Sequence, residues 1–140
     1  MKRMKIVLVV SAFLAALLTV SPVHAADQLA APLKGTWTGS SSGYQGTSFT
    51  SGFEKIVITK TKGRSAVGTW QYKTKASDKW SKPERVTLTV FPNDASGLVV
   101  YGADAGGVYS GELTESGELT LAYSQVAAKP MTLQFQLSKR

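Results

Sequence analysis

Apolar and polar residues alternate with a period of two along most of the chain after residue 25. Residues 131–137, Met-Thr-Leu-Gln-Phe-Gln-Leu, place every apolar side chain at an odd position and every polar one at an even position. Residues 86–90, Val-Thr-Leu-Thr-Val, show the same alternation. Because successive side chains of a β-strand point to opposite faces, this pattern predicts strands with one buried and one solvated face. No window shows the 3.6-residue repeat of an amphipathic helix, so we expect an all-β domain.

Segments rich in turn-forming residues divide the pattern into eight expected strands. Glycines at positions 63, 97, 106, 107 and 117 lie in these turns. We expect the strands at residues 33–40, 53–61, 64–74, 85–91, 98–102, 108–114, 118–124 and 131–138. Short connections pair neighbouring strands antiparallel, and closure into an up-and-down β-barrel leaves no open edge. A β-sandwich of the same strands is the alternative architecture.

The first 25 residues have the pattern of a secretory signal peptide. Three basic residues precede an apolar run from residue 6 to residue 20, and Val23-His24-Ala25 offers small residues at the cleavage positions. The alternative is a membrane anchor, but the run is short of the roughly 20 apolar residues that a spanning helix needs. We therefore expect residues 1–25 to be removed and residues 26–140 to form a single β-barrel domain, periplasmic or secreted, in a bacterium.

Loss of this leader would leave a domain without histidine or cysteine, because His24 is the only histidine in the sequence and there is no cysteine. Ser-His-Asp and Cys-His catalytic groups are then excluded, as are metal sites built from His or Cys. No carboxylates show the spacing of a calcium loop. We expect no catalytic residues, no metal and no cofactor. Hydrolysis by a close pair of carboxylates in a cleft is the remaining catalytic alternative.

Positive charge is concentrated in one part of the chain. Of the 16 Lys and Arg residues, nine lie between Lys55 and Arg85. One interpretation is a solvated face whose lysines protect strand edges. The other is attraction to an anionic partner such as an envelope polysaccharide, a phosphate-bearing lipid or an acidic protein. We expect no nucleic-acid partner, because the basic segment lacks the aromatic interleaving of known motifs. The chain is not expected to span a membrane as a barrel either, because several strands carry Lys or Glu in mid-run.

The start of the first expected strand, Gly35-Thr36-Trp37, resembles the Gly-x-Trp opening of calycin-type barrels, the lipocalins and avidins. The resemblance implies that Gly35 lets the chain turn into the barrel and that Trp37 plugs its closed end. It also implies that a basic residue of the last strand, Lys139 or Arg140, packs across the indole. The biotin site of avidins does not carry over, because Gly39 stands where that family has a polar asparagine. Residues 40–42, all serine, are expected to form a flexible loop.

Aromatic residues give the best indication of a binding site. Ala66, Gly68, Trp70 and Tyr72 share one face of the third expected strand. If this face points inward, small residues at one end and large rings at the other leave a tapered cavity, whereas the alternative is a filled core. Trp80 lies in a polar and basic loop, where it either folds back over the barrel mouth or contacts a partner.

These patterns predict a non-catalytic binding protein for a small amphipathic or anionic ligand, held inside the barrel or at its mouth. The candidate ligand-binding residues are Trp70, Tyr72, Trp80 and Tyr109 for contact area, and Arg64, Lys73 and Lys82 for an anionic end. The alternative is a protein-interaction or inhibitor-type module that uses Trp80 and the basic segment 55–85 as an outer surface. A void of about 300 Å³ or more favours the first function, and a packed interior with an exposed Trp80 favours the second.

Overall fold

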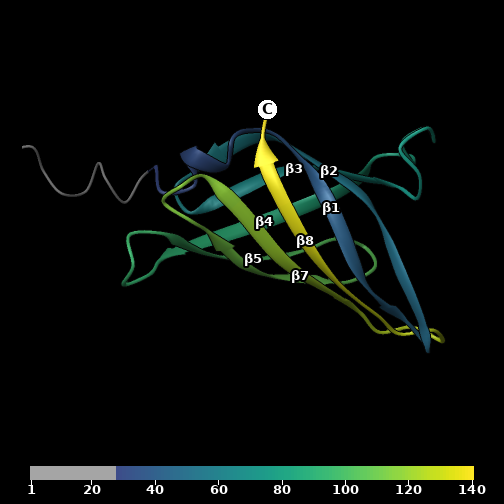
Figure 1. Ribbon diagram of the computed structural model, residues 1–140. Helices are drawn as coiled ribbons and strands as arrows, with labels where there is room; N and C mark the ends of the chain where they lie inside the picture. The colour runs from purple at the N-terminus through teal and green to yellow at the C-terminus, as the bar shows by residue number, and fades with distance from the viewer. Residues whose placement is uncertain (1–27) are drawn as a thin grey trace, which may run out of the picture.

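The chain forms a closed barrel of eight antiparallel strands, each paired with its neighbours in sequence (Figure 1). The structure is a computed structural model that describes residues 28–140, and the expected signal peptide lies outside the described residues. The elements are a short 3-10 helix η1 (Ala31–Leu33) and strands β1 (Gly35–Gln45), β2 (Ser48–Lys62), β3 (Ser65–Lys73), β4 (Glu84–Pro92), β5 (Leu98–Ala103), β6 (Val108–Leu113), β7 (Glu118–Gln125) and β8 (Met131–Lys139). The prediction of an up-and-down barrel is confirmed, and the sandwich alternative is wrong.

The period-two pattern determines which side chains fill the barrel. On β8, Leu133, Phe135 and Leu137 are buried, whereas the residues between them are exposed. On β4, Val86 and Leu88 are likewise buried. Each such apolar side chain contributes about 1.5–3 kcal/mol when it leaves water. Within residues 28–140 we find no helix of the length and apolar character needed to cross a membrane.

The β1–β2 hairpin is longer than the sequence predicted (Figure 1). Residues 40–42, expected as a flexible loop, lie inside β1, and Ser41 is opposite Gly52 on β2 and Phe135 on β8. The chain reverses only at Gly46, whose φ of 60° lies in the left-handed region that favours glycine. The loop prediction was wrong because pairing along both edges outweighs the turn preference of serine. As a result, the Ser41 side chain is buried inside the barrel.

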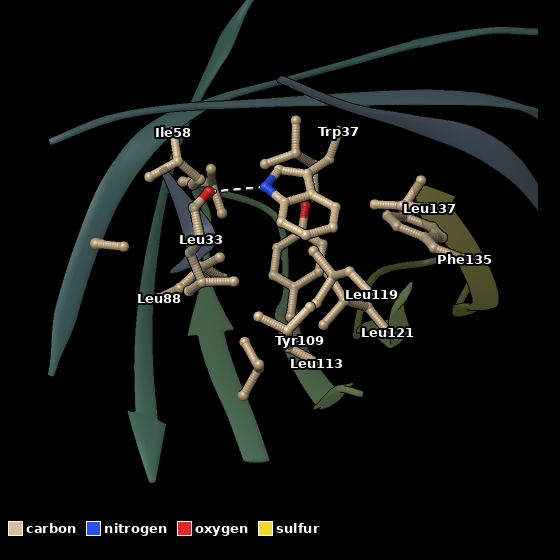
Figure 2. Packing of buried hydrophobic residues seen from close by; sticks show 14 of the residues in the cluster. Leu33, Trp37, Ile58, Leu88, Tyr109, Leu113, Leu119, Leu121, Phe135 and Leu137 are labelled. Carbon is tan, nitrogen blue, oxygen red and sulfur yellow. Dashed lines mark hydrogen bonds between the residues drawn. The ribbon is translucent and has the colours of Figure 1, made fainter. Parts of the chain in front are cut away.

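One end of the barrel is closed by η1. Leu33, expected to start the first strand, belongs to this helix, and its carbonyl oxygen accepts a hydrogen bond of 2.7 Å from Trp37 Nε1 (Figure 2). Lys139 Nζ lies 5.5 Å from the centroid of the Trp37 ring and donates to the Pro32 carbonyl at 3.0 Å. Gly35 has φ 129°, and a Cβ there would lie 2.8 Å from the Lys139 side chain. The contacts that the Gly-x-Trp resemblance implied for Trp37 and Lys139 are therefore confirmed.

Side chains inside the barrel change in kind along its axis. On β3, Ala66 and Gly68 are buried toward the closed end, and Trp70 is buried further along the same face. The Trp70 ring centroid lies 5.7 Å from that of Tyr123 and 6.5 Å from that of Phe135. The inward orientation proposed for this face of the third strand is confirmed. The closed half of the barrel is packed, and a layer of aromatic rings separates it from the open half.

Candidate functional site

A cavity of about 360 Å³ occupies the end of the barrel opposite η1. It exceeds the size of about 300 Å³ at which a ligand-binding interior becomes the favoured interpretation. Six strands and two loops contribute to its wall, which is lined by Ser41, Gln45, Thr50, Ser51, Gly52, Glu54, Trp70, Tyr72, Lys73, Thr74, Glu84, Gly106, Tyr123, Gln125, Met131 and Leu133. The interior of the barrel is therefore a filled core at one end and a ligand-sized space at the other.

Glu54, on β2, is the one carboxylate that is buried among residues 28–140, with 2% of its surface exposed. Its Oε1 atom accepts a hydrogen bond of 2.6 Å from Ser41 Oγ, and its Oε2 atom accepts one of 2.6 Å from Trp70 Nε1. Hydrogen bonds to an ionised acceptor are stronger than neutral ones. The two donors fix the carboxyl group at the wall of the cavity, between β1 and β3.

Burial raises the pKa of Glu54 to about 7, and the hydrogen bonds from Ser41 and Trp70 partly oppose this rise. The carboxyl group therefore gains or loses its charge close to neutral pH. Ionisable groups with strongly shifted pKa values are concentrated at functional sites, because burial and neighbouring charges there adjust each pKa to the task of the group. Glu54 is therefore a candidate functional residue of this cavity.

Glu54 was missed as a candidate from the sequence, although a signal was present. The alternation that places Ile56 and Ile58 on the inward face of β2 places Glu54 on the same face. A carboxylate on the same strand face as buried isoleucines is itself buried, unless the strand ends before it, and burying a charged group is costly. Ser41 was missed for a different reason, because it was expected in a loop. Together they supply the buried polar side chains of the cavity wall, beside the more exposed Gln45, Thr50 and Gln125.

Aromatic rings form the other part of the wall. Trp70 and Tyr72 stack with ring centroids 5.4 Å apart and an interplanar angle of 28°. Tyr123 packs against the opposite side of the barrel interior, 5.7 Å from Trp70. Trp70 is buried, whereas Tyr72 is 47% exposed at the rim. Tyr72 is therefore the ring of this wall that is open to solvent, and Trp70 is the one that contacts Glu54.

Asp104, in the loop between β5 and β6, accepts hydrogen bonds that position the hydroxyl groups of Tyr109 and Tyr123. Its carboxylate accepts hydrogen bonds from the backbone amides of Gly106 and Gly107, each at 2.7 Å, and from the Tyr109 hydroxyl. The Tyr123 hydroxyl lies 3.5 Å from the same carboxylate. Burial, with the charge of Asp104, raises the pKa of Tyr109 well above its usual value and that of Tyr123 to about 12. Both hydroxyls remain protonated donors at neutral pH.

The structure brings together only some of the ligand-binding residues proposed from the sequence. Trp70, Tyr72 and Lys73 line the cavity. Tyr109 is buried in the aromatic layer below it, with its ring 4.8 Å from that of Tyr123. Arg64 lies at the closed end, where its guanidinium is 5.4 Å from the Phe91 ring and its carbonyl accepts a hydrogen bond from Val90. Lys82, in the β3–β4 connection, is exposed and outside the lining of the cavity.

Trp80 folds back, but onto the outer wall rather than over the mouth. The β3–β4 connection runs along β3, because the Ser81 amide donates to the Tyr72 carbonyl at 2.8 Å. The Trp80 ring then lies 4.7 Å from Lys55 Nζ and 5.0 Å from Lys73 Nζ. An outer groove of about 540 Å³ lies beside it, lined by Thr38, Gly39, Ser40, Phe53, Lys73, Ala76, Trp80, Ser138 and Arg140. Trp80 therefore belongs to an outer surface that shares only Lys73 with the lining of the cavity.

Comparison with known proteins gives a match in fold. No family model matches the sequence, and no curated protein matches it. Among solved structures, the crystal structure of Rv2717c from M. tuberculosis is similar, with a TM-score of 0.55 and 15% sequence identity. The match covers 81% of this chain and 96% of that chain. At this identity the similarity concerns the fold alone.

Proposed function

We propose that this protein is a non-catalytic, exported binding protein that takes a small amphipathic ligand in the cavity at the open end of its barrel. The observation that carries the proposal is a space of about 360 Å³ that combines an aromatic wall with a buried carboxyl group. Ligand sites in proteins have volumes of about 300–1,000 Å³, with apolar walls and a few polar groups that fix orientation. The export part of the proposal rests on the signal-peptide pattern of residues 1–25.

The cavity suggests how such a ligand lies. Its apolar body packs against Trp70, Tyr72 and Tyr123, which are rigid rings that lose little conformational entropy on binding. Its polar group reaches Glu54, whose orientation is set before binding by Ser41 and Trp70. A preorganised polar group of this kind lowers the free-energy cost of ordering the site.

The geometry favours an amphipathic ligand over one with an anionic end. Arg64 and Lys82 lie outside the cavity lining. Lys73 lines the cavity, but its ammonium donates to the Ala76 carbonyl and lies over the Phe53 and Trp80 rings, on the outer side of the wall. A ligand group that donates hydrogen bonds to Glu54 therefore fits the cavity better than an anion.

Fluorescence titration with N-phenyl-1-naphthylamine, a neutral amphipathic probe, tests the proposal. The expected result is saturable enhancement of probe fluorescence that Thr50→Trp abolishes, because Thr50 lines the cavity and a large ring there fills it. Thr132→Trp is the matched control, because Thr132 is exposed on the outer face of β8. Absence of saturable binding, or equal loss in both variants, would contradict the proposal.

A second candidate function is favoured by the position of Trp80. The outer groove combines Phe53 and Trp80 with the cations Lys73 and Arg140, which suits an acidic partner. Because Trp80 lies outside the cavity, Trp80→Ala separates the two functions. It should weaken retention on an acidic matrix such as immobilised polygalacturonate and leave binding of the naphthylamine probe unchanged. Retention that is equal in the variant and the unmodified protein would remove this candidate.

A further inference from the structure

We propose that the cavity selects an organic cation, specifically an amine whose ammonium group binds beside the Glu54 carboxylate, at the open side of the ring cluster of Trp70, Tyr72 and Tyr123. This inference rests on the proposed function, because it concerns the ligand class of the same cavity. The charges that face the cavity, the arrangement of the rings and the protonation of Glu54 support it.

The charges around the cavity are predominantly negative. Glu54 and Glu84 both line it, and Asp104 lies 3.5 Å from the hydroxyl of the lining residue Tyr123. Among residues 28–140, Lys73 is the only basic residue of the lining, and its ammonium is held on the outer side by the Ala76 carbonyl and the Trp80 ring. The charges of Asp104, Glu84 and Glu54 each add to the effect of burial in raising the pKa of Tyr123. A cation entering the cavity is therefore attracted, whereas an anion is repelled.

The ring faces act in the same direction as the carboxylates. The face of an aromatic ring carries partial negative charge, and ammonium groups bind favourably over Trp and Tyr faces when both are shielded from water. Trp70 is stacked on Tyr72 at 5.4 Å and lies 5.7 Å from Tyr123, so the three rings contact one another. The ring of this cluster that is open to an ammonium group is Tyr72, which is 47% exposed. An apolar body attached to the ammonium group would fill the remaining space toward Met131 and Leu133.

Binding of an amine also changes the protonation of Glu54. Without ligand, Glu54 is largely a neutral acid below its pKa of about 7, which burial has raised. A bound ammonium group favours the carboxylate, so binding below pH 7 converts the acid to a carboxylate–ammonium pair and releases the proton to solvent. The observed affinity for an amine should therefore rise about tenfold from pH 6 to pH 8 and level off above that.

Other charged or titratable groups also face Glu54 from neighbouring elements: Tyr72, Lys73, Glu84, Asp104, Tyr109 and Tyr123. Tyr109 and Tyr123 keep their protons because burial raises their pKa values. Residues 28–140 contain no histidine, so the usual source of titration between pH 6 and pH 8 is missing from the described chain.

Three probes of one shape and different charge test the inference in calorimetric titrations at pH 8: benzylammonium, benzyl alcohol and benzoate. The expected order has benzylammonium at least tenfold tighter than benzyl alcohol, and benzoate weakest. Glu54→Gln should reduce benzylammonium to the affinity of benzyl alcohol. Glu118→Gln is the matched control and should keep the preference, because Glu118 is exposed on β7 and outside the lining.

The proton balance provides a second measurement that needs no variant. Titrations of benzylammonium at pH 6 in two buffers with different ionisation enthalpies should show release of nearly one proton per amine bound, and benzyl alcohol should show none. Equal binding of benzylammonium and benzyl alcohol, or the absence of proton release, would overturn the cation selectivity while leaving the binding function intact. If none of the three probes binds and the naphthylamine probe does not bind either, the result contradicts the proposed function as well as the cation selectivity.

Discussion

Glu54 should make the folded barrel less stable as the pH rises through neutrality, which is opposite to the behaviour of a carboxylate that is stabilised by the fold. Its pKa is raised from 4.5 to about 7, because burial disfavours the charged form. The folded protein therefore binds more protons than the unfolded chain between these two values. Stability from this group is present below pH 4.5 and is lost as the pH rises through 7.

The size of the effect follows from the two pKa values. Each pKa unit of difference corresponds to 1.36 kcal/mol, so the group should reduce the free energy of unfolding by about 2.5 kcal/mol between pH 5 and pH 8. This is a large fraction of the roughly 5–15 kcal/mol by which proteins of this kind are stable. The change should therefore be measurable by an ordinary denaturation experiment.

Urea unfolding followed by circular dichroism at several pH values between 5 and 8 measures this slope. The Glu54→Gln variant, which cannot ionise at this position, should lose most of it. The Glu118→Gln variant should keep it, because Glu118 is exposed. A stability that is flat or rises with pH in the unmodified protein would show that Glu54 is ionised with little penalty. An unchanged slope in Glu54→Gln would assign the effect to another group.

Three further predictions concern the same barrel. Trp37→Phe removes the hydrogen bond to the Leu33 carbonyl and should cost about 1–3 kcal/mol in urea unfolding, because the carbonyl remains buried without that donor. Gly68→Ala would place a Cβ 2.0 Å from a carbonyl oxygen of β2 and should cost about 3 kcal/mol or more, measured as a lower midpoint of thermal unfolding. Ser41→Ala removes one of the hydrogen bonds that lower the pKa of Glu54, so the pH midpoint of the stability change should move upward.

The barrel was predictable because its strands carry their own signal. Residues 131–138 were expected as a strand from strict alternation, and β8 spans Met131–Lys139. The limits of the first hairpin were not predictable, because the serines of β1 carry no apolar alternation, and only their partners on β2 and β8 hold them in the sheet. Local preference and tertiary pairing disagreed there, and the pairing decided the structure.

The candidate site was predictable in its aromatic part only. Trp70 and Tyr72 follow from the face they share with Ala66, but which strands lie across the barrel from them depends on closure. The basic residues were grouped by their nearness in sequence, whereas the barrel separates Arg64 at the closed end from Lys73 at the open end. Nearness in sequence is a poor guide in a meander, because the 9 residues of β3 carry the chain from one end of the barrel to the other.

Pairing of the first strand with the last has a consequence for the order of folding. β8 lies beside β1 from the pair Trp37–Lys139 to the pair Gln45–Met131, and these are contacts of large sequence separation. Such contacts form slowly, because a long intervening segment must first be brought together. The barrel cannot close until its last strand is available, and a chain lacking β8 would leave β1 and β7 with unpaired backbone groups open to aggregation. Synthesis must therefore reach the C-terminal strand before the cavity exists.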